Sequence, residues 1–335
     1  MTMSDTEDTP PRALWIERPG QAALQPVELP PVGPADVLVR SRFGAVSRGT
    51  EALVMQGRVP ESERERMRCP FQEGAFPGPV KYGYITVGVV ETGAFGLRGR
   101  DVFCLHPHQE RFVVPADAVH VLPDGLPPDR AVLAANMETA VNVLWDAEIG
   151  PGDRVAVIGA GVVGCLAAHL AAAVPGAAVS LVDIDPGKAA VATALGLDFR
   201  SPDSMPRDCD VVIHVSGHPA GLETALTAAG TEARIVEASW FGDHSVPLPL
   251  GRAFHARRLT LRSSQVGRLP PARAPRWDHR RRMALALALL RDPTYEALIT
   301  HECAFDDLPA VLARIVENSA GVLCQRIRYP ETRND

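Results

Sequence analysis

The sequence predicts an α/β protein built from a β-rich domain and a domain with a doubly wound parallel sheet. Its 335 residues exceed the roughly 100 to 200 of a typical single domain, so two hydrophobic cores are expected. From about residue 140, apolar strands alternate with helical segments, which is typical of a parallel sheet with crossover helices. Before that point, short apolar runs are separated by Pro and Gly, as in closely spaced strands.

Strand-like runs in the first third of the chain include residues 34–43 and 84–91. Between them, residues 58–68 carry many charges and no apolar face, and residues 69–79 are rich in Gly, Pro and Phe. We therefore expect a surface loop over a cleft in this region.

The later part of the chain has the rhythm of a parallel sheet. Strands are predicted over 155–158, 178–183, 210–215, 233–238 and 259–262. Helices are predicted over 162–173, 187–194, 220–230, 280–291 and 308–318. Because the strands are apolar throughout, both faces of this sheet should be buried.

Composition argues against several classes of protein. A formal net charge of −6 gives no general attraction for polyphosphate, so no nucleic-acid partner is expected. The apolar stretch 165–174 is far shorter than the about 20 residues that span a bilayer, so no membrane association is expected. The acidic N-terminal segment lacks the features of a secretory signal, which predicts a cytoplasmic protein. The six cysteines include no Cys-x-x-Cys pair, so reduced thiols are expected.

A glycine-rich turn directly follows the predicted strand 155–158 and opens an apolar helix. The turn contains Gly159, Gly161, Val162, Val163 and Gly164, and Asp183 closes the next strand. This combination is the complete dinucleotide fingerprint. Gly159 permits the tight turn, Gly161 lets the backbone approach a pyrophosphate, and Gly164 lets the helix pack on the strand. The unpaired N–H groups of the first helical turn, at Val162 and Val163, would face the phosphates.

Asp183 favours NAD over NADP as the cofactor. Its carboxylate can accept hydrogen bonds from both ribose hydroxyls and would repel a 2′-phosphate, and the next residue is Ile184 rather than an arginine. Lys188 weakens this preference, because its ammonium group could reach the ribose or a phosphate. The alternative for Lys188 is a solvated lysine at a helix start.

The β-rich N-terminal part, the dinucleotide motif and the C-terminal segment 297–312 together resemble the medium-chain dehydrogenase/reductase superfamily, over nearly the whole chain. The resemblance implies a GroES-like catalytic domain, here residues 1–136 and 267–335, and a Rossmann domain, here residues 137–266. It also implies catalysis in the cleft between them and a homodimer.

The chain departs from the zinc-dependent members of that superfamily at each ligand position. Ser47 stands where the first cysteine ligand is found, Tyr84 stands at the histidine position, and the third position falls near Ala135 or Asn136. The four-cysteine structural lobe is also missing. Hydroxyl and amide groups are poor zinc ligands compared with thiolate and imidazole, so neither a catalytic nor a structural zinc is expected.

Among the zinc-free members, the run Ser47–Glu51 and the chain length are similar to the bacteriochlorophyllide hydroxyethyl dehydrogenase-like group. The likeness does not identify a tetrapyrrole substrate, and the quinone-reductase branch stays open.

Without a metal, a side chain or water must exchange a proton with the substrate oxygen. Tyr84 could donate from its phenol, or it could simply fill the space that zinc leaves. His106 and His108 are two residues apart after a strand, so both imidazoles could line one side of the cleft. A structural role for the pair, or metal binding together with Cys104, are the alternatives.

Five polar residues complete the predicted site. The resemblance places Ser47 and Thr139 beside the nicotinamide, where their hydroxyls would relay protons. Glu51 and Glu138 are nearby carboxylates that could tune them or form buried structural hydrogen bonds. Lys81 could steer an anionic substrate or be a surface lysine.

A run of arginines, Arg268, Arg273, Arg276 and Arg280–Arg282, stands out on an acidic chain. Such a run could clamp a carboxylate or phosphate, although a solvated helix start or an interface is the more common role.

These observations favour a zinc-independent, NAD(H)-dependent oxidoreductase that acts on an alcohol/carbonyl pair of a small-molecule substrate, which could be anionic. One alternative is an NADPH-dependent enone or quinone reductase. Another, from a different class, is a dinucleotide-binding regulator without turnover.

Overall fold

The computed structural model describes residues 10–94, 96–318 and 320–330, and it confirms the α/β fold class. Within this part of the chain, one sheet has six parallel strands in the order β12-β11-β10-β13-β14-β15. Its strands are β10 (Arg154–Ile158), β11 (Ala178–Val182), β12 (Asp198–Arg200), β13 (Cys209–His214), β14 (Ala229–Glu237) and β15 (Thr260–Ser263). β11 and β12 are added on one side of β10, and β13, β14 and β15 on the other side. Ligands bind at this reversal of strand order, between β10 and β13, in such sheets.

Helices cover both faces of this sheet. They are α2 (Ala134–Ala147), α3 (Val162–Ala172), α4 (Ala189–Ala194), α5 (Pro219–Ala228) and α6 (Ala253–Ala256). Alternate residues of β10 face two different cores: Val155 and Val157 pack with α2 and α3, whereas Ala156 and Ile158 pack with α5. The prediction that both faces are buried is therefore confirmed.

Two details of the predicted elements were wrong. β12 was not predicted, because it is only three residues long. The predicted helix 220–230 ends at Ala228, and β14 begins at Ala229 instead of residue 233.

The β-rich half contains two further sheets. One has the order β16-β17-β3-β6-β7-β9, with β8 paired to β3, and the other has the order β2-β1-β5-β4. The strands from the N-terminal part are β1 (Arg12–Arg18), β2 (Gln21–Pro26), β3 (Asp36–Val46), β4 (Glu73–Gly74), β5 (Val80–Lys81), β6 (Thr86–Gly93), β7 (Asp101–Cys104), β8 (Arg111–Pro115) and β9 (Val119–Val121). The C-terminal part adds β16 (Ile299–Ala304) and β17 (Cys324–Arg328), and β17 pairs antiparallel with β3.

Three more helices join these sheets: α1 (Arg48–Met55), α7 (His279–Leu289) and α8 (Leu308–Glu317). Leu308, Val311, Leu312 and Ile315 recur at helical spacing along α8 and are buried against α1 and the strands. Short 3₁₀ turns cover Glu61–Glu63, Ala116–Ala118, Ala131–Leu133, Pro186–Lys188, Pro293–Leu298 and Phe305–Asp307. No helix within the described residues is long and apolar enough to cross a membrane.

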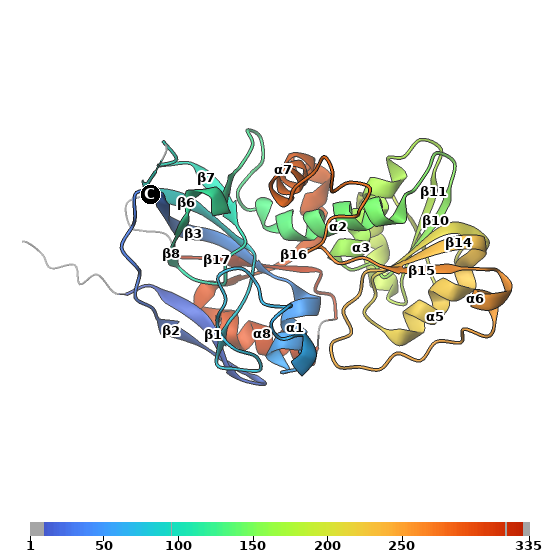
Figure 1. The fold of residues 1–335 in the computed structure, drawn as a ribbon, viewed down its shortest axis with the longest axis horizontal. Coiled ribbons are helices and arrows are strands. Elements are labelled where there is room, and N and C mark those ends of the chain that lie inside the picture. The colour runs from blue at the N-terminus through green and yellow to red at the C-terminus, as the bar shows by residue number, and fades with distance from the viewer. Residues whose placement is uncertain (1–9, 95, 319, 331–335) are drawn as a thin grey trace, which may run out of the picture.

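The β-rich half and the parallel sheet lie at opposite ends of the molecule, with α2, α3 and α7 between them (Figure 1). The pairing of β17 with β3 brings the two ends of the chain into one sheet. The boundaries at residues 136/137 and 266/267 stay a prediction.

A buried polar network joins α2 to α7 at this junction. Arg282 of α7 is 2 % exposed, and its guanidinium donates to the Glu138 carboxylate, to the Asn142 side chain and to the Val266 carbonyl. Asn142 in turn donates to Asp146, which also accepts from Ser264 at 2.7 Å. Burial raises the pKa of Glu138, although the charge of Arg282 acts in the opposite direction.

This network bears on two predictions. Arg282 was part of the possible substrate clamp, but its guanidinium bonds to protein groups at the junction. For Glu138, a tuning role and a buried structural hydrogen bond were both left open, and the pair with Arg282 is a buried structural contact. A charge this deeply buried must be paired, and α7 supplies the partner from more than 140 residues away in sequence.

Replacing Arg282 with Ala is expected to lower the free energy of unfolding by about 3 to 5 kcal/mol, because it leaves Glu138 buried without its partner. Arg280→Ala is the matched control on the same helix, since Arg280 is exposed and donates to the Asp117 carbonyl at the surface. Arg280→Ala should lower the free energy of unfolding by less than about 1 kcal/mol. Urea unfolding of both variants measures the difference, and equal losses would contradict a structural role for the network.

Candidate functional site

The glycine-rich turn is shaped by positions that accept no side chain. Gly159 has φ +112°, and a Cβ atom there would lie 2.7 Å from the backbone of Ser216. A Cβ atom on Gly164 would lie 1.8 Å from the Gly159 carbonyl oxygen. Gly161 caps α3 and borders open space, so its backbone can be approached by a ligand. The structure thus gives each glycine of the motif the steric role that the motif predicts.

A cavity of about 410 Å³ opens beside this turn, at the carboxyl ends of the parallel strands. Val162 and Val163 begin the helix next to it, where the first N–H groups have no partner within the helix. The cavity is lined by Arg48, Ile158, Gly159, Gly161, Val182, Asp183, Ile184, Asp185, Lys188, Pro202, Val215, Ser216, His218, Ala220, Gly221, Thr224, Ala320 and Gly321. Its position and donor groups suit the pyrophosphate and adenosine part of a dinucleotide.

Asp183 is held at the cavity wall by three donors. Its carboxylate accepts from the Ala160 N–H at 2.7 Å, the Asp185 N–H at 2.9 Å and the Lys188 ammonium at 2.9 Å. Burial would raise the pKa of Asp183, but these hydrogen bonds outweigh it and hold the pKa below its ordinary value. Lys188 is therefore an ion-pair partner of Asp183 rather than a solvated lysine. Ile184 is 87 % exposed at the same wall, where it could pack on a flat ring.

Arg48 joins this cavity to the β-rich half. It is the first residue of α1, lines the cavity, and donates to the Val322 carbonyl at 2.8 Å. Burial lowers the pKa of Arg48, and the charge of Asp183 acts in the opposite direction. A cation at this position can neutralise a pyrophosphate.

Ser47, Tyr84, Glu51 and His108 form one hydrogen-bonded chain next to Arg48. The Tyr84 phenol donates to the Ser47 hydroxyl, and the Glu51 carboxylate accepts from the Ser47 backbone N–H at 2.8 Å. The other Glu51 oxygen lies 2.9 Å from His108 Nε2, and both side chains are almost fully buried. Burial raises the pKa of Tyr84 to about 12, although its hydrogen bond with Ser47 acts in the opposite direction.

The two histidines do not share partners, so the expectation that both line one side of the cleft was wrong. His106 stacks on Phe112 with ring centroids 3.8 Å apart and on Phe71 at 5.5 Å, whereas His108 bonds to Glu51. The His106 N–H donates to the Cys104 carbonyl, a three-residue turn that ends the extended strand and its alternation of sides. Burial lowers the pKa of His106 to about 3.

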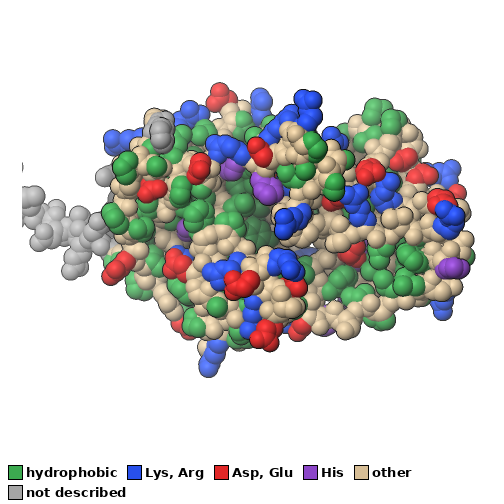
Figure 2. All heavy atoms as spheres, in the orientation of Figure 1, with side chains coloured by type: hydrophobic (Ala, Val, Ile, Leu, Met, Phe, Trp, Pro, Cys, Tyr) green, Lys and Arg blue, Asp and Glu red, His purple; other side chains and the backbone are tan. Residues whose placement is uncertain are grey.

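Lys81 lies in other surroundings than predicted, whereas the predicted place of Thr139 beside the nicotinamide stays a prediction. Lys81 is only 3 % exposed, pairs with Glu73 and donates to Gln109 at 2.8 Å, so it is not a surface lysine. It borders a second cavity of about 590 Å³ in the β-rich half together with His106. The Thr139 hydroxyl donates to the Ala135 carbonyl of its own helix at 2.9 Å. Figure 2 shows a recess with apolar side chains at its base between the β-rich half and the central helices.

Sequence reasoning missed Arg48 and the cavity residues that follow β13, including Ser216, His218 and Gly221. The signal for the latter was present, since ligands bind at the carboxyl ends of parallel strands and the strand 210–215 was predicted. Nothing comparable pointed to Arg48, because it comes from the other half of the molecule.

A zinc ion does not suit the predicted ligand positions. Ser47 and Tyr84 contribute hydroxyl groups that already bond to each other, and neither a thiolate nor an imidazole completes a set with them. Among the described residues, no group of three or more His, Cys, Asp and Glu side chains could hold a metal ion.

Comparison with known proteins found no matching family model. The chain is 25% identical over 299 residues to D-guloside 3-dehydrogenase of Escherichia coli strain K12, covering 81% of this chain and 85% of that protein. It is also 27% identical over 272 residues to an uncharacterized zinc-type alcohol dehydrogenase-like protein of Haemophilus influenzae, covering 71% of this chain and 78% of that protein. Sorbitol dehydrogenase of Bacillus subtilis strain 168 is 24% identical over 144 residues, which is 39% of this chain and 41% of that protein.

Solved structures show the same fold. A short chain alcohol dehydrogenase from E. coli CFT073, complexed with NADH, superimposes with a TM-score of 0.74 at 17% identity over 95% of this chain and 99% of that one. A putative zinc-binding dehydrogenase from Sinorhizobium meliloti 1021, bound to NADP, superimposes with a TM-score of 0.75 at 19% identity, also over 95% of this chain and 99% of that one.

The buried, neutral His106 predicts a pH dependence of stability. Because its pKa is about 3 in the folded protein and near 6.5 when unfolded, the unfolded state binds one more proton between these values. The free energy of unfolding should therefore fall as the pH is lowered from about 6.5, by up to about 1.4 kcal/mol per pH unit from this residue. His106→Phe should flatten that slope in urea unfolding, whereas His301→Phe, at an exposed position, should leave it unchanged.

Proposed function

Because this chain belongs to the medium-chain dehydrogenase/reductase superfamily, we propose that it is a zinc-independent, NAD(H)-dependent oxidoreductase acting on an alcohol/carbonyl pair. A dehydrogenase acting on alcohols is what its relatives support. The observation that carries the metal-free proposal is the hydrogen bond between Tyr84 and Ser47, the two residues that the sequence resemblance aligns with zinc ligands. Ser47 directly precedes Arg48, which lines the dinucleotide cavity, so the hydrogen-bonded Ser47 and Tyr84 lie next to that cavity.

A bound nicotinamide would supply or accept the hydride. In the direction of reduction, the Tyr84 phenol gives its proton to the substrate oxygen, which takes it readily because an alkoxide is a stronger base than a phenolate. Ser47 stabilises the phenolate through its hydroxyl group. Glu51 fixes Ser47 through the backbone N–H, and His108 holds Glu51, so the buried pair positions the donor.

Relatives suggest the substrate class. D-Guloside 3-dehydrogenase and sorbitol dehydrogenase carry names of sugar and polyol substrates, which makes a polyol or sugar the first choice for this chain. Lys81 is one basis for an anionic substrate, and an anion would have to replace the half-exposed Glu73 as its partner. Thr139, a homodimer and the proposed domain boundaries are parts of this proposal that rest on the superfamily resemblance.

NADPH-dependent reduction is the second candidate. The ion pair of Lys188 with Asp183 reduces the negative charge that would repel a 2′-phosphate, and one structural neighbour is bound to NADP. With either cofactor, Asp183 would face the adenosine ribose.

Cofactor titration separates these candidates. Fluorescence titration should show NADH binding at least about tenfold more tightly than NADPH, and Asp183→Asn should narrow that ratio, because it removes the carboxylate charge without changing the side-chain shape. Asp203→Asn, at an exposed position outside the cavity lining, is the control and should leave the ratio unchanged. Tighter binding of NADPH by the unaltered protein would replace the NAD proposal with the second candidate.

Tyr84→Phe tests the proton donor. It should lower kcat for a polyol or its ketone by about 10² to 10⁴-fold while leaving the Kd of NADH unchanged, because the phenol acts only on the substrate oxygen. The unaltered enzyme should show no loss of activity from Tyr84 ionisation below about pH 11, given the raised pKa of Tyr84.

Removal of metal ions with a chelator should leave the activity unchanged, and one stoichiometric zinc per chain would overturn the metal-free proposal. Tight cofactor binding without turnover on any alcohol would favour a regulator.

A further inference from the structure

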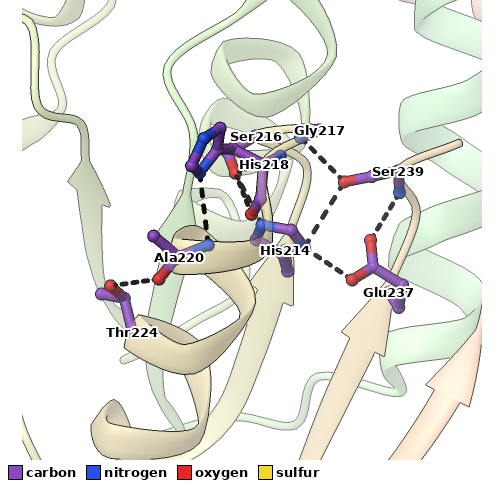
Figure 3. Close-up of polar contacts among 8 residues, drawn as sticks. All are labelled: His214, Ser216, Gly217, His218, Ala220, Thr224, Glu237 and Ser239. Atoms are coloured by element: carbon purple, nitrogen blue, oxygen red, sulfur yellow. Dashed lines mark hydrogen bonds and ion pairs between the residues drawn. The ribbon is translucent and has the colours of Figure 1, made fainter. Parts of the chain in front are cut away.

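Glu237, His214 and Ser216 form a hydrogen-bonded triad at the rim of the dinucleotide cavity. Glu237 Oε2 lies 2.6 Å from His214 Nδ1, and His214 Nε2 lies 2.6 Å from Ser216 Oγ (Figure 3). His214 is 0 % exposed, whereas Ser216 is exposed and lines the cavity. A buried imidazole thus connects a carboxylate in the sheet to a hydroxyl that a ligand can reach.

The parallel sheet creates this arrangement. His214 and Glu237 are the last residues of β13 and β14 and are paired directly across the two strands. The second oxygen of Glu237 accepts from the Ser239 N–H at 2.7 Å, so the carboxylate is fixed at both oxygens. Ser239 Oγ in turn accepts from the Gly217 N–H at 3.1 Å.

Gly221 leaves the space that the triad needs. It stands in the first turn of α5, and a Cβ atom there would lie 2.2 Å from Ser216 Oγ and 2.7 Å from His214 Nε2. Because real Cβ atoms do not approach other atoms so closely, any other residue at this position would displace the hydrogen bond between Ser216 and His214. The contact between hydroxyl and imidazole therefore depends on the absence of a side chain.

The hydrogen-bond directions follow from the charges. A carboxylate accepts only, so the ring proton of neutral His214 belongs on Nδ1, facing Glu237. Nε2 must then accept, and Ser216 donates its proton to it. Ser216 Oγ also accepts from the His218 N–H at 3.2 Å. The His218 carbonyl, at 3.4 Å, is a more distant acceptor for its proton than His214 Nε2 at 2.6 Å. This is the arrangement that activates the serine of acyl-transfer enzymes.

We infer that Ser216 is an activated nucleophile that accepts acyl and phosphonyl groups from activated donors. Ser216 Oγ attacks the carbonyl carbon of an ester while its proton moves to His214 Nε2. The bond to the alcohol breaks, and the leaving oxygen takes the proton from His214. Water then attacks the acyl-serine and gives a proton to His214, which returns it to Ser216 Oγ as the carboxylic acid leaves. Glu237 stabilises the imidazolium in both steps.

The loop limits which donors react. The N–H groups of Gly217, His218, Ala220 and Gly221 already bond to Ser239, Ser216, His218 Nδ1 and the His218 carbonyl, and Pro219 has none. These four N–H groups are therefore not free to stabilise an oxyanion, and one such donor is worth about 10² to 10³ in rate. Reaction is expected with activated esters and fluorophosphonates rather than with amides. A dinucleotide in the cavity would cover Ser216 and block the reaction.

The test is labelling of the full-length protein, freed of cofactor, with an alkyl fluorophosphonate, followed by peptide mass spectrometry. Ser216 should react at least about 100-fold faster than Ser204, an exposed serine that bonds only to Ser201. Glu237→Gln should slow the labelling at least about tenfold, since it removes the charge that stabilises the imidazolium. Saturating NADH should protect Ser216. The same sample should release p-nitrophenol from p-nitrophenyl acetate, and Ser216→Ala should abolish that release.

Equal labelling of Ser216 and Ser204, or an ester hydrolysis rate unchanged by Ser216→Ala, would overturn the inference. Circular dichroism and thermal unfolding check that Ser216→Ala and Glu237→Gln are folded. Gly221→Ala provides an independent variant, because it should suppress labelling without removing any member of the triad. Since no alcohol or ketone is present in these assays, their outcome is independent of whether Tyr84 is the proton donor of the proposed oxidoreductase.

Discussion

The carboxyl edge of the parallel sheet is packed so closely that three positions on it accept no side chain. Gly159 and Gly164 bring β10, the loop after β13 and α3 into direct backbone contact. Gly221 lets α5 approach the side chains of His214 and Ser216. The first two create the turn and the helix start that face the dinucleotide cavity. The third leaves room for the triad. One steric constraint at the point where the strand order reverses therefore shapes both features of the cavity.

Buried charged side chains also connect the elements at the junction between the parallel sheet and the β-rich half. α2 lies between the parallel sheet and the β-rich half, and the pairing of Glu138 with Arg282 joins it to α7. In the β-rich half, the buried pair of Glu51 and His108 holds the start of α1. Ser47 caps α1 and Arg48 begins it, so the Glu51–His108 pair fixes the segment from which Arg48 reaches the cavity. The contribution of both buried pairs lies in positioning, since a buried ion pair adds little net stability over apolar packing.

Local patterns predicted the fold well, and they failed wherever a side chain met a partner distant in sequence. The strands and helices followed from apolar spacing, and the glycine turn followed from a short motif. The partner of Glu138 was not identified because Arg282 lies far along the chain, and local spacing does not reveal a buried pair. His106 and His108 were assigned to one side from the alternation of an extended chain. The turn at Cys104 interrupts that alternation. Both cases concern where a side chain points.

The sequence by itself determined the α/β class and the glycine-rich turn, since each depends on residue type within a short window. It also predicted a site without zinc around Ser47 and Tyr84. The tertiary structure decided which polar groups meet. It paired Tyr84 with Ser47, Lys188 with Asp183, and Glu237 with His214 and Ser216. The physical reason is that the strength of a hydrogen bond or ion pair depends on distances of a few ångströms and on burial. Neighbouring strands and packed helices set those distances, and residue order alone does not.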